Sequence, residues 1–220
     1  MPISRLAHWL ISTFHTMYRI EETENETNLV NDPGADYGMY SYADYLKWRI
    51  EERLELIKGK IFKMAAPQRL HQKISMNISV LVANFLHKKS CEVYSAPFDV
   101  RLPVQNKKKD NEVTTVVQPD ICVICDPAKL DAKGCCGAPD LVVEILSPGN
   151  SRMEVQNKFE LYEESGVLEY WIVFPDEKNI VVYTLNNGKF TGSKPYAPGE
   201  NIPSSVLPGL DISVESIFEN

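Results

Sequence analysis

Apolar residues recur at two different spacings along this chain, and the changes between them divide it into helices and strands. Residues 71–88 have helical spacing, with one apolar face formed by Ile74, Ile78, Leu81, Val82 and Phe85. A second helix is expected after Ser151, where Glu154 completes a capping-box pattern, and it ends at Gly166. The pattern therefore predicts two long amphipathic helices, and a shorter helical segment begins at Ser41.

Runs of β-branched and aromatic residues between these helices predict strands. Residues 53–64 are predicted to form two short strands that turn at Lys58–Gly59, and 169–174 are predicted to pair with 180–185. Further strands are expected over 93–96, 99–102, 116–124 and 138–146, and a last strand with a helical turn over 207–218. Residues 126–137 are expected to form a loop. This order predicts an α/β or α+β fold, with a mixed β-sheet core flanked by helices.

The chain divides into a leader and one ordered domain. Residues 1–20 have the pattern of a short amphipathic segment, and residues 21–36 that of an acidic, polar linker. The ordered domain is expected over 39–220. Residues 1–38 are expected to be poorly ordered, or to precede the native start, because Met17 and Met39 are both possible first residues. The net charge of −7 argues against broad, non-specific phosphate binding.

The five cysteines predict reduced, mostly buried thiols in a cytoplasmic protein, since their number is odd and most lie in apolar runs. The alternative is a zinc site made of Cys122 and Cys125 with Cys135 and Cys136. A spacing of three residues in a predicted strand places Cys122 and Cys125 on opposite faces, which argues against zinc. No run approaches the roughly 18 apolar residues of a membrane span, so no membrane association is expected.

Glu144 lies within the apolar run 141–146, where a buried carboxylate is costly unless it is paired or binds a metal. Asp120 follows Pro119 in the preceding predicted strand. Two carboxylates on adjacent strands suit Mg²⁺ or Mn²⁺, which bind phosphate oxygens and can activate water. Asp140, on the same strand face as Glu144, is the alternative partner, and Asp120 could instead only cap a strand end.

Such chemistry usually also uses a lysine, and the position two residues after Glu144 is occupied by Leu146. Lys158, in the helix that follows, can point toward the sheet instead, or form an exposed helix pair with Glu154. Glu55 is a third acid in an apolar run, or else a half-exposed strand residue. His71 opens the long helix and could reach the same cleft, or serve only as a helix-start residue.

Several of these segments together resemble the Uma-two family of endonucleases with the restriction-endonuclease-like PD-(D/E)XK fold. The resemblance extends from about residue 40 to 218. It is carried by Tyr42-Ala-Asp-Tyr-Leu, Leu54-Glu-Leu-Ile-Lys-Gly-Lys, His71, Gln118-Pro-Asp-Ile, Ala138-Pro-Asp-Leu-Val-Val-Glu-Ile-Leu-Ser-Pro, Lys158, Tyr162, Gly166-Val-Leu-Glu-Tyr-Trp-Ile-Val and Leu207-Pro-Gly-Leu.

The resemblance implies a metal site formed by Asp120 and Glu144, a relocated catalytic Lys158 and a helper acid, Glu55. The chain departs from the family at Lys58, where Asp is usual, and at Glu154, where Asp is frequent. The hypothesis is a Mg²⁺- or Mn²⁺-dependent endonuclease that acts on nucleic acid, expected to be DNA, as a homodimer. The alternatives are a non-catalytic or regulatory nucleic-acid-binding module and a hydrolase of small phosphodiesters. The Lys107–Lys109 run, in a charged segment predicted to be a loop, is a candidate phosphate contact, or else only a solvated loop.

Overall fold

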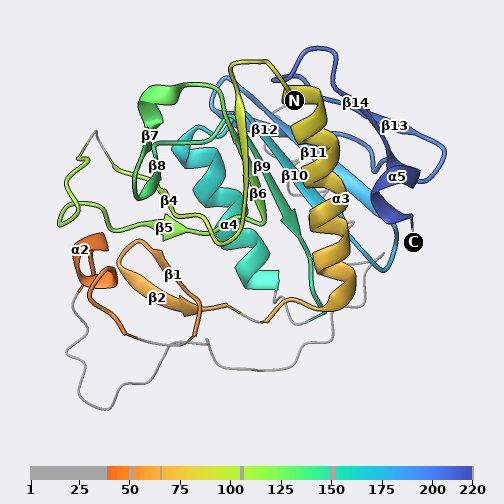
Figure 1. The fold of residues 1–220 in the computed structure, drawn as a ribbon. Coiled ribbons are helices and arrows are strands. Elements are labelled where there is room, and N and C mark those ends of the chain that lie inside the picture. The colour runs from red at the N-terminus through yellow and green to blue at the C-terminus, as the bar shows by residue number, and fades with distance from the viewer. Residues whose placement is uncertain (1–38, 50–51, 65, 105–106, 149–151, 220) are drawn as a thin grey trace, which may run out of the picture.

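A computed structural model describes residues 39–49, 52–64, 66–104, 107–148 and 152–219. The expectations for residues 1–38 and for Ser151 as a helix cap lie outside these residues. Figure 1 shows two long helices on opposite sides of a central sheet, with a second sheet and a two-stranded pair beside it. The described part of the chain contains no helix that is long and apolar enough to cross a membrane.

The central sheet has six strands in the order β12-β11-β10-β9-β6-β3. These strands are β3 (Glu92–Ser95), β6 (Ile121–Ile124), β9 (Leu141–Ile145), β10 (Glu169–Phe174), β11 (Asn179–Asn186) and β12 (Lys189–Gly192). Strands β9 and β10 are parallel, whereas the other neighbouring pairs are antiparallel. The crossover between β9 and β10 is helix α4 (Arg152–Ser165). The sheet is therefore mixed, as the sequence predicts.

Strand β9 is buried on both faces because a helix covers each face. Leu141, Val143 and Ile145 pack against α3 (Arg69–Leu86), together with α5 (Val214–Phe218) and the β13–β14 pair (Asn201–Pro203 and Asp211–Ser213). Val142 on the opposite face packs with Leu161 and Tyr162 of α4. Glu144 alternates with these residues and so lies on the α4 face.

A second sheet, β2-β1-β5-β4-β8-β7, packs against the α4 face of the central sheet. Its strands are β1 (Leu54–Ile57), β2 (Lys60–Lys63), β4 (Val100–Arg101), β5 (Val116–Val117), β7 (Leu130–Asp131) and β8 (Gly134–Cys136). The short helix α2 (Tyr42–Tyr45) packs beside β1 and β5. The β1–β2 turn at Lys58–Gly59 has positive φ angles of 49° and 81°, and the Gly59 N–H donates to the carbonyl of Thr114.

The structure confirms the predicted fold class and most elements, and it corrects two of them. Residues 116–124 are not one strand, because Gln118-Pro119-Asp120 interrupts the run and sends β5 and β6 into different sheets. Pro119 lacks an N–H and therefore cannot continue a ladder. Residues 126–137 are not a loop but a short 3₁₀ turn (η1, Pro127–Lys129) followed by the β7–β8 hairpin.

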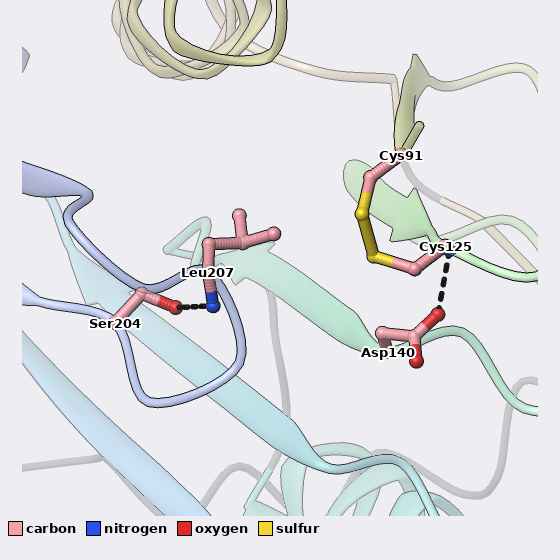
Figure 2. Close-up of a disulfide and its surroundings, with 5 residues drawn as sticks. All are labelled: Cys91, Cys125, Asp140, Ser204 and Leu207. Carbon is pink, nitrogen blue, oxygen red and sulfur yellow. Dashed lines mark hydrogen bonds between the residues drawn. A yellow bond between two sulfur atoms is a disulfide. The ribbon is translucent and has the colours of Figure 1, made fainter. Parts of the chain in front are cut away.

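The prediction of reduced thiols is wrong for two of the five cysteines. Cys91, before β3, and Cys125, after β6, form a disulfide between neighbouring strands (Figure 2). The two residues are 34 apart in sequence, so only the β3–β6 pairing brings them together. Cys122, Cys135 and Cys136 are free thiols. Cytoplasmic location remains a prediction, and its cysteine argument is weakened because disulfides are rare in reducing compartments.

Candidate functional site

Asp120 and Glu144 come from neighbouring strands and lie at the same level of the sheet. The β6–β9 ladder pairs Ile121 with Val143, and one further residue in this register places Asp120 beside Glu144. The Ile145 N–H also donates to Asp120 Oδ2 at 2.8 Å. Asp120 is therefore held against the strand that carries Glu144, as the sequence predicts.

Lys158 points from α4 into the protein and joins two carboxylates. Its Nζ lies 3.0 Å from Glu144 Oε1 and 3.1 Å from Glu55 Oε1. The lysine is 8% exposed, so it is not the exposed partner of Glu154 that helical spacing also allowed. Helix α4 thus supplies the ammonium group that Leu146 cannot provide from the strand.

Glu55 comes from the second sheet and is 3% exposed, which excludes the half-exposed interpretation. Its Oε1 also accepts a hydrogen bond of 3.0 Å from the backbone N–H of Gln118. Gln118 lies in the break between β5 and β6, two residues before Asp120. The interruption that the sequence did not predict therefore brings the acids of both sheets to one place.

Tyr162 is a site residue that the hydrophobic pattern of the sequence does not single out. It lies one turn after Lys158, and its hydroxyl donates to Glu144 Oε1 at 2.6 Å. Glu144 Oε1 thus accepts from both Tyr162 and Lys158. The signal in the sequence was the i, i+4 spacing of a lysine and a tyrosine on a helix directly after the acidic strand.

His71 reaches the site from α3, on the other side of the sheet. Its Nε2 lies 3.1 Å from Asp120 Oδ2. Among the described residues, its buried Nδ1 has no hydrogen-bond partner. Burial alone would lower the pKa of His71, but the hydrogen bond and charge of Asp120 outweigh it, so this pKa is raised. His71 is therefore a neighbour of Asp120 as well as a helix-start residue.

The site carries an excess of negative charge in a buried place. Burial, together with the charges of Asp120 and Glu55, raises the pKa of Glu144 from 4.5 to about 7, although Lys158 and Tyr162 favour its ionised form. Burial would lower the pKa of Lys158, but the charges of Glu144, Glu55 and Asp120 reverse this and raise it. Three carboxylates thus surround one ammonium, a net charge of −2 when all three carboxylates are ionised and His71 is neutral.

A polar network behind Glu55 contains further residues that sequence reasoning missed. The side-chain oxygen of Gln118 accepts from Arg53 Nη2 at 2.9 Å, and its Nε2 donates to Asp99 Oδ1 at 2.9 Å. Asp99 also accepts from the hydroxyl of Tyr42. Gln118 is therefore fixed at both ends, and so is the N–H that it presents to Glu55.

Comparison with known proteins places this fold in a family. The sequence model of Uma2, described as "Putative restriction endonuclease", matches residues 42–215. The chain belongs to the Uma2 family. It is 29% identical over 193 residues to "Uncharacterized protein slr1290" from Synechocystis, a match that covers 86% of this chain and 97% of that protein.

A solved structure is similar to this Uma2 protein in its fold. It is the crystal structure of a "putative nuclease belonging to DUF820" from Anabaena variabilis, with a TM-score of 0.63 and 21% identity. The match covers 81% of this chain and 97% of that chain. The resemblance recognised from the sequence is thereby confirmed at the level of family and fold.

Asp140 directly precedes β9, the strand of Glu144, in this Uma2 protein but is not brought together with Glu144. Its carboxylate accepts from the backbone N–H of Cys125 at 2.7 Å, next to the disulfide (Figure 2). Glu144 lies four positions further along the chain, about 13 Å away at a strand's rise per residue. Asp140 therefore caps the far end of β6 instead of pairing with Glu144.

Four lysines outside the carboxylate cluster have surface positions. Lys58, a departure from the family pattern, forms an exposed ion pair with Glu164 at 2.8 Å and so links the β1–β2 turn to α4. Lys107–Lys109 is exposed, between β4 and β5. The contact of Lys107–Lys109 with phosphate remains a prediction.

The donor set fits a hard divalent cation. Among the described residues, no three His, Cys, Asp or Glu side chains are grouped as ligands that could hold a metal ion by themselves. Mg²⁺ does not need such a cage, because it usually binds one or two carboxylates and keeps several waters or phosphate oxygens. The carboxylates of Asp120 and Glu144 could supply these two ligands, and the net charge of −2 would be balanced by one divalent ion.

Proposed function

We propose that this protein is a Mg²⁺- or Mn²⁺-dependent endonuclease that hydrolyses phosphodiester bonds in nucleic acid, with DNA as the expected substrate. The observation that carries this proposal is the buried Lys158 ammonium shared by Glu144 and Glu55, beside Asp120. The family description and the description of the Anabaena structure as a nuclease support the same reaction class.

In this proposal, Asp120 and Glu144 hold the cation through carboxylate oxygens. The bound ion would favour ionisation of a water molecule and stabilise the charge that develops on the phosphate. His71 and the Ile145 N–H orient Asp120, and the Tyr162 hydroxyl orients Glu144. These contacts would hold both carboxylates in a fixed orientation toward the cation.

Lys158 would stabilise the scissile phosphate or orient the attacking water. The surrounding carboxylates keep it protonated, so it can donate hydrogen bonds throughout the reaction. Hydrolysis forms one P–O bond from water and breaks the P–O bond to the leaving oxygen. The leaving oxygen takes up one proton from solvent, and one proton leaves the attacking water. Glu55 lies within reach of Lys158 and would accept that proton or contact the metal.

The test is cleavage of supercoiled plasmid and of single-stranded DNA with Mg²⁺ or Mn²⁺. Asp120→Ala and Glu144→Ala should each abolish cleavage, whereas Glu160→Gln, on the exposed face of α4, should retain it. Cleavage that survives in both alanine variants would refute the assignment of the site.

Two other outcomes would identify the alternative functions. Divalent-ion binding without cleavage of any nucleic acid would indicate a regulatory or binding module. Hydrolysis of a nucleotide diester without cleavage of DNA would indicate a small-phosphodiester hydrolase. We also propose that the endonuclease acts as a homodimer, since cutting both strands of a duplex requires two sites. Light scattering across a range of protein concentrations tests this part.

A further inference from the structure

A pocket of about 400 Å³ adjoins the carboxylate cluster, between the β3–β4 connection and the β7–β8 hairpin. Its volume falls within the roughly 300–1,000 Å³ typical of small-molecule sites. Gly134 lets the hairpin close against the floor of the pocket, because a Cβ atom there would lie 2.3 Å from the carbonyl oxygen of Asp99. The Cys135 N–H donates to the same carbonyl at 2.9 Å.

One wall of the pocket is aromatic. Tyr94 and Phe98 stack with their ring centroids 4.1 Å apart and their planes 10° from parallel, and both side chains remain partly exposed. Partly exposed aromatic rings in a pocket offer a surface on which a planar heterocycle can stack. The aromatic wall therefore favours a ring-shaped ligand.

The polar groups of the pocket favour a ligand that donates hydrogen bonds. Asp99 accepts hydrogen bonds from uncharged donors, the hydroxyls of Tyr42 and Tyr45 and the Gln118 amide. The second lining aspartate, Asp131, is paired with Arg101, and the lysine that lines the pocket, Lys133, is paired with Asp110. The pocket is thus lined by two aspartates and by no spare lysine, which disfavours a phosphate and suits an amino group on a neutral ring.

The pocket is directly connected to the proposed catalytic cluster. Gln118 lines the pocket, and its backbone N–H donates to Glu55 Oε1. The Ala96 N–H, at the end of the aromatic wall, donates to the main-chain oxygen of Asp120 at 3.1 Å. A ligand in the pocket would therefore lie beside residues that contact Glu55 and Asp120 of the proposed catalytic cluster.

We infer that this pocket binds one unpaired nucleobase of the substrate, with a preference for bases that carry an amino group. The inference rests on the proposed nuclease function and adds a substrate class to it: nucleic acid with an unstacked nucleotide beside the scissile phosphate. A base inside an intact duplex could not enter, so single-stranded or locally unpaired DNA would be cleaved in preference to a perfect duplex.

Saturation-transfer NMR with adenosine, cytidine and thymidine tests base binding without any phosphodiester or metal. Adenosine and cytidine should receive saturation on their base protons, more strongly than thymidine. Phe98→Leu should weaken their binding by at least about fivefold, which corresponds to the lower end of the free energy that stacking on an aromatic side chain contributes to base binding. Ala132→Trp, which fills the pocket from an exposed hairpin position, should abolish binding even if Phe98→Leu does not fold.

The matched control is Phe218→Leu, a partly buried phenylalanine of α5 on the α3 side of the sheet, which should bind nucleosides like wild type. The inference would be overturned if adenosine and cytidine at millimolar concentration received no saturation from the wild-type protein. It would also be overturned if they received as much saturation from Ala132→Trp as from wild type. Equal transfer to thymidine would overturn the preference for amino-bearing bases.

A cleavage assay separates failure of this inference from failure of the proposed function. Wild type with Mn²⁺ should cut a strand that carries an unpaired loop faster than a perfect duplex, and Ala132→Trp should lose this preference. If wild type cleaves both substrates at the same rate, the proposed nuclease function stands and the role of the pocket is refuted. If nucleosides bind but no DNA is cleaved, the nuclease function is refuted and the nucleobase-binding site stands.

Discussion

Replacement of Glu144 by glutamine should stabilise the metal-free protein at neutral and alkaline pH while it abolishes the proposed activity. Glu144 is buried among two other carboxylates, and its pKa is raised from 4.5 to about 7. Glutamine has the same shape as the protonated acid and can still accept from Tyr162 and Lys158. The variant therefore removes a charge that folding disfavours and leaves the surrounding hydrogen bonds in place.

The magnitude and sign follow from the difference between the folded and unfolded pKa. Below about pH 4.5 the carboxyl is protonated in both states, so the variant and wild type should have nearly equal stability. Between about pH 4.5 and 7 only the folded state keeps the proton, so the stability of wild type falls as pH rises. Above about pH 7 the penalty is complete, at most about 3 kcal/mol, since one pKa unit corresponds to about 1.4 kcal/mol.

Urea denaturation of both proteins in chelator-containing buffer, across this pH range, measures the effect. The free energy of unfolding of Glu144→Gln should exceed that of wild type by up to about 3 kcal/mol at pH 8 and by little at pH 4. Glu160→Gln, at an exposed position of α4, should show no such pH-dependent difference. A difference between Glu144→Gln and wild type that stays constant with pH would refute the reasoning.

Three further predictions test other parts of the account. Glu169→Ala should lower the free energy of unfolding, measured in urea, by about 3–5 kcal/mol. The reason is that the buried Glu169 carboxylate accepts from Trp171 Nε1 and from both the backbone N–H and the hydroxyl of Ser205. A loss below about 1 kcal/mol would contradict this prediction. Cys125→Ser should cost about 3–4 kcal/mol in the same assay, the loop-entropy value for a separation of 34 residues, and equal stability of wild type with and without reductant would speak against the disulfide. Lys158→Met should abolish plasmid cleavage, and Leu146→Lys in that background should restore part of it by returning the ammonium to the strand. A folded double variant with no activity would show that the two positions are not equivalent.

Much of the fold was predictable because local pattern and tertiary structure agree. The alternation in β9 and the helical spacing of α3 each match the face that the structure buries. The interruption at Pro119 was missed because apolar residues continue on both sides of it, so the run resembles one strand. The β7–β8 hairpin was missed because its strands have only two and three residues.

The candidate site was predictable to the extent that it breaks the apolar pattern. Glu144 and Asp120 were recognisable because a carboxylate in a buried strand is costly without a partner. Tyr162 and Gln118 were not, since a tyrosine in an apolar stripe and a glutamine before a proline conform to ordinary packing. The Cys91–Cys125 disulfide depends on a strand pairing between distant segments, which residue counts alone do not reveal.

The most direct test of the central claim is a crystal of this protein soaked in Mn²⁺ and measured for anomalous scattering. The account predicts one anomalous peak in contact with the carboxylates of both Asp120 and Glu144, and its loss in Glu144→Gln. A protein that cleaves DNA but shows no peak between these two side chains, or one that binds Mn²⁺ only elsewhere, would contradict it.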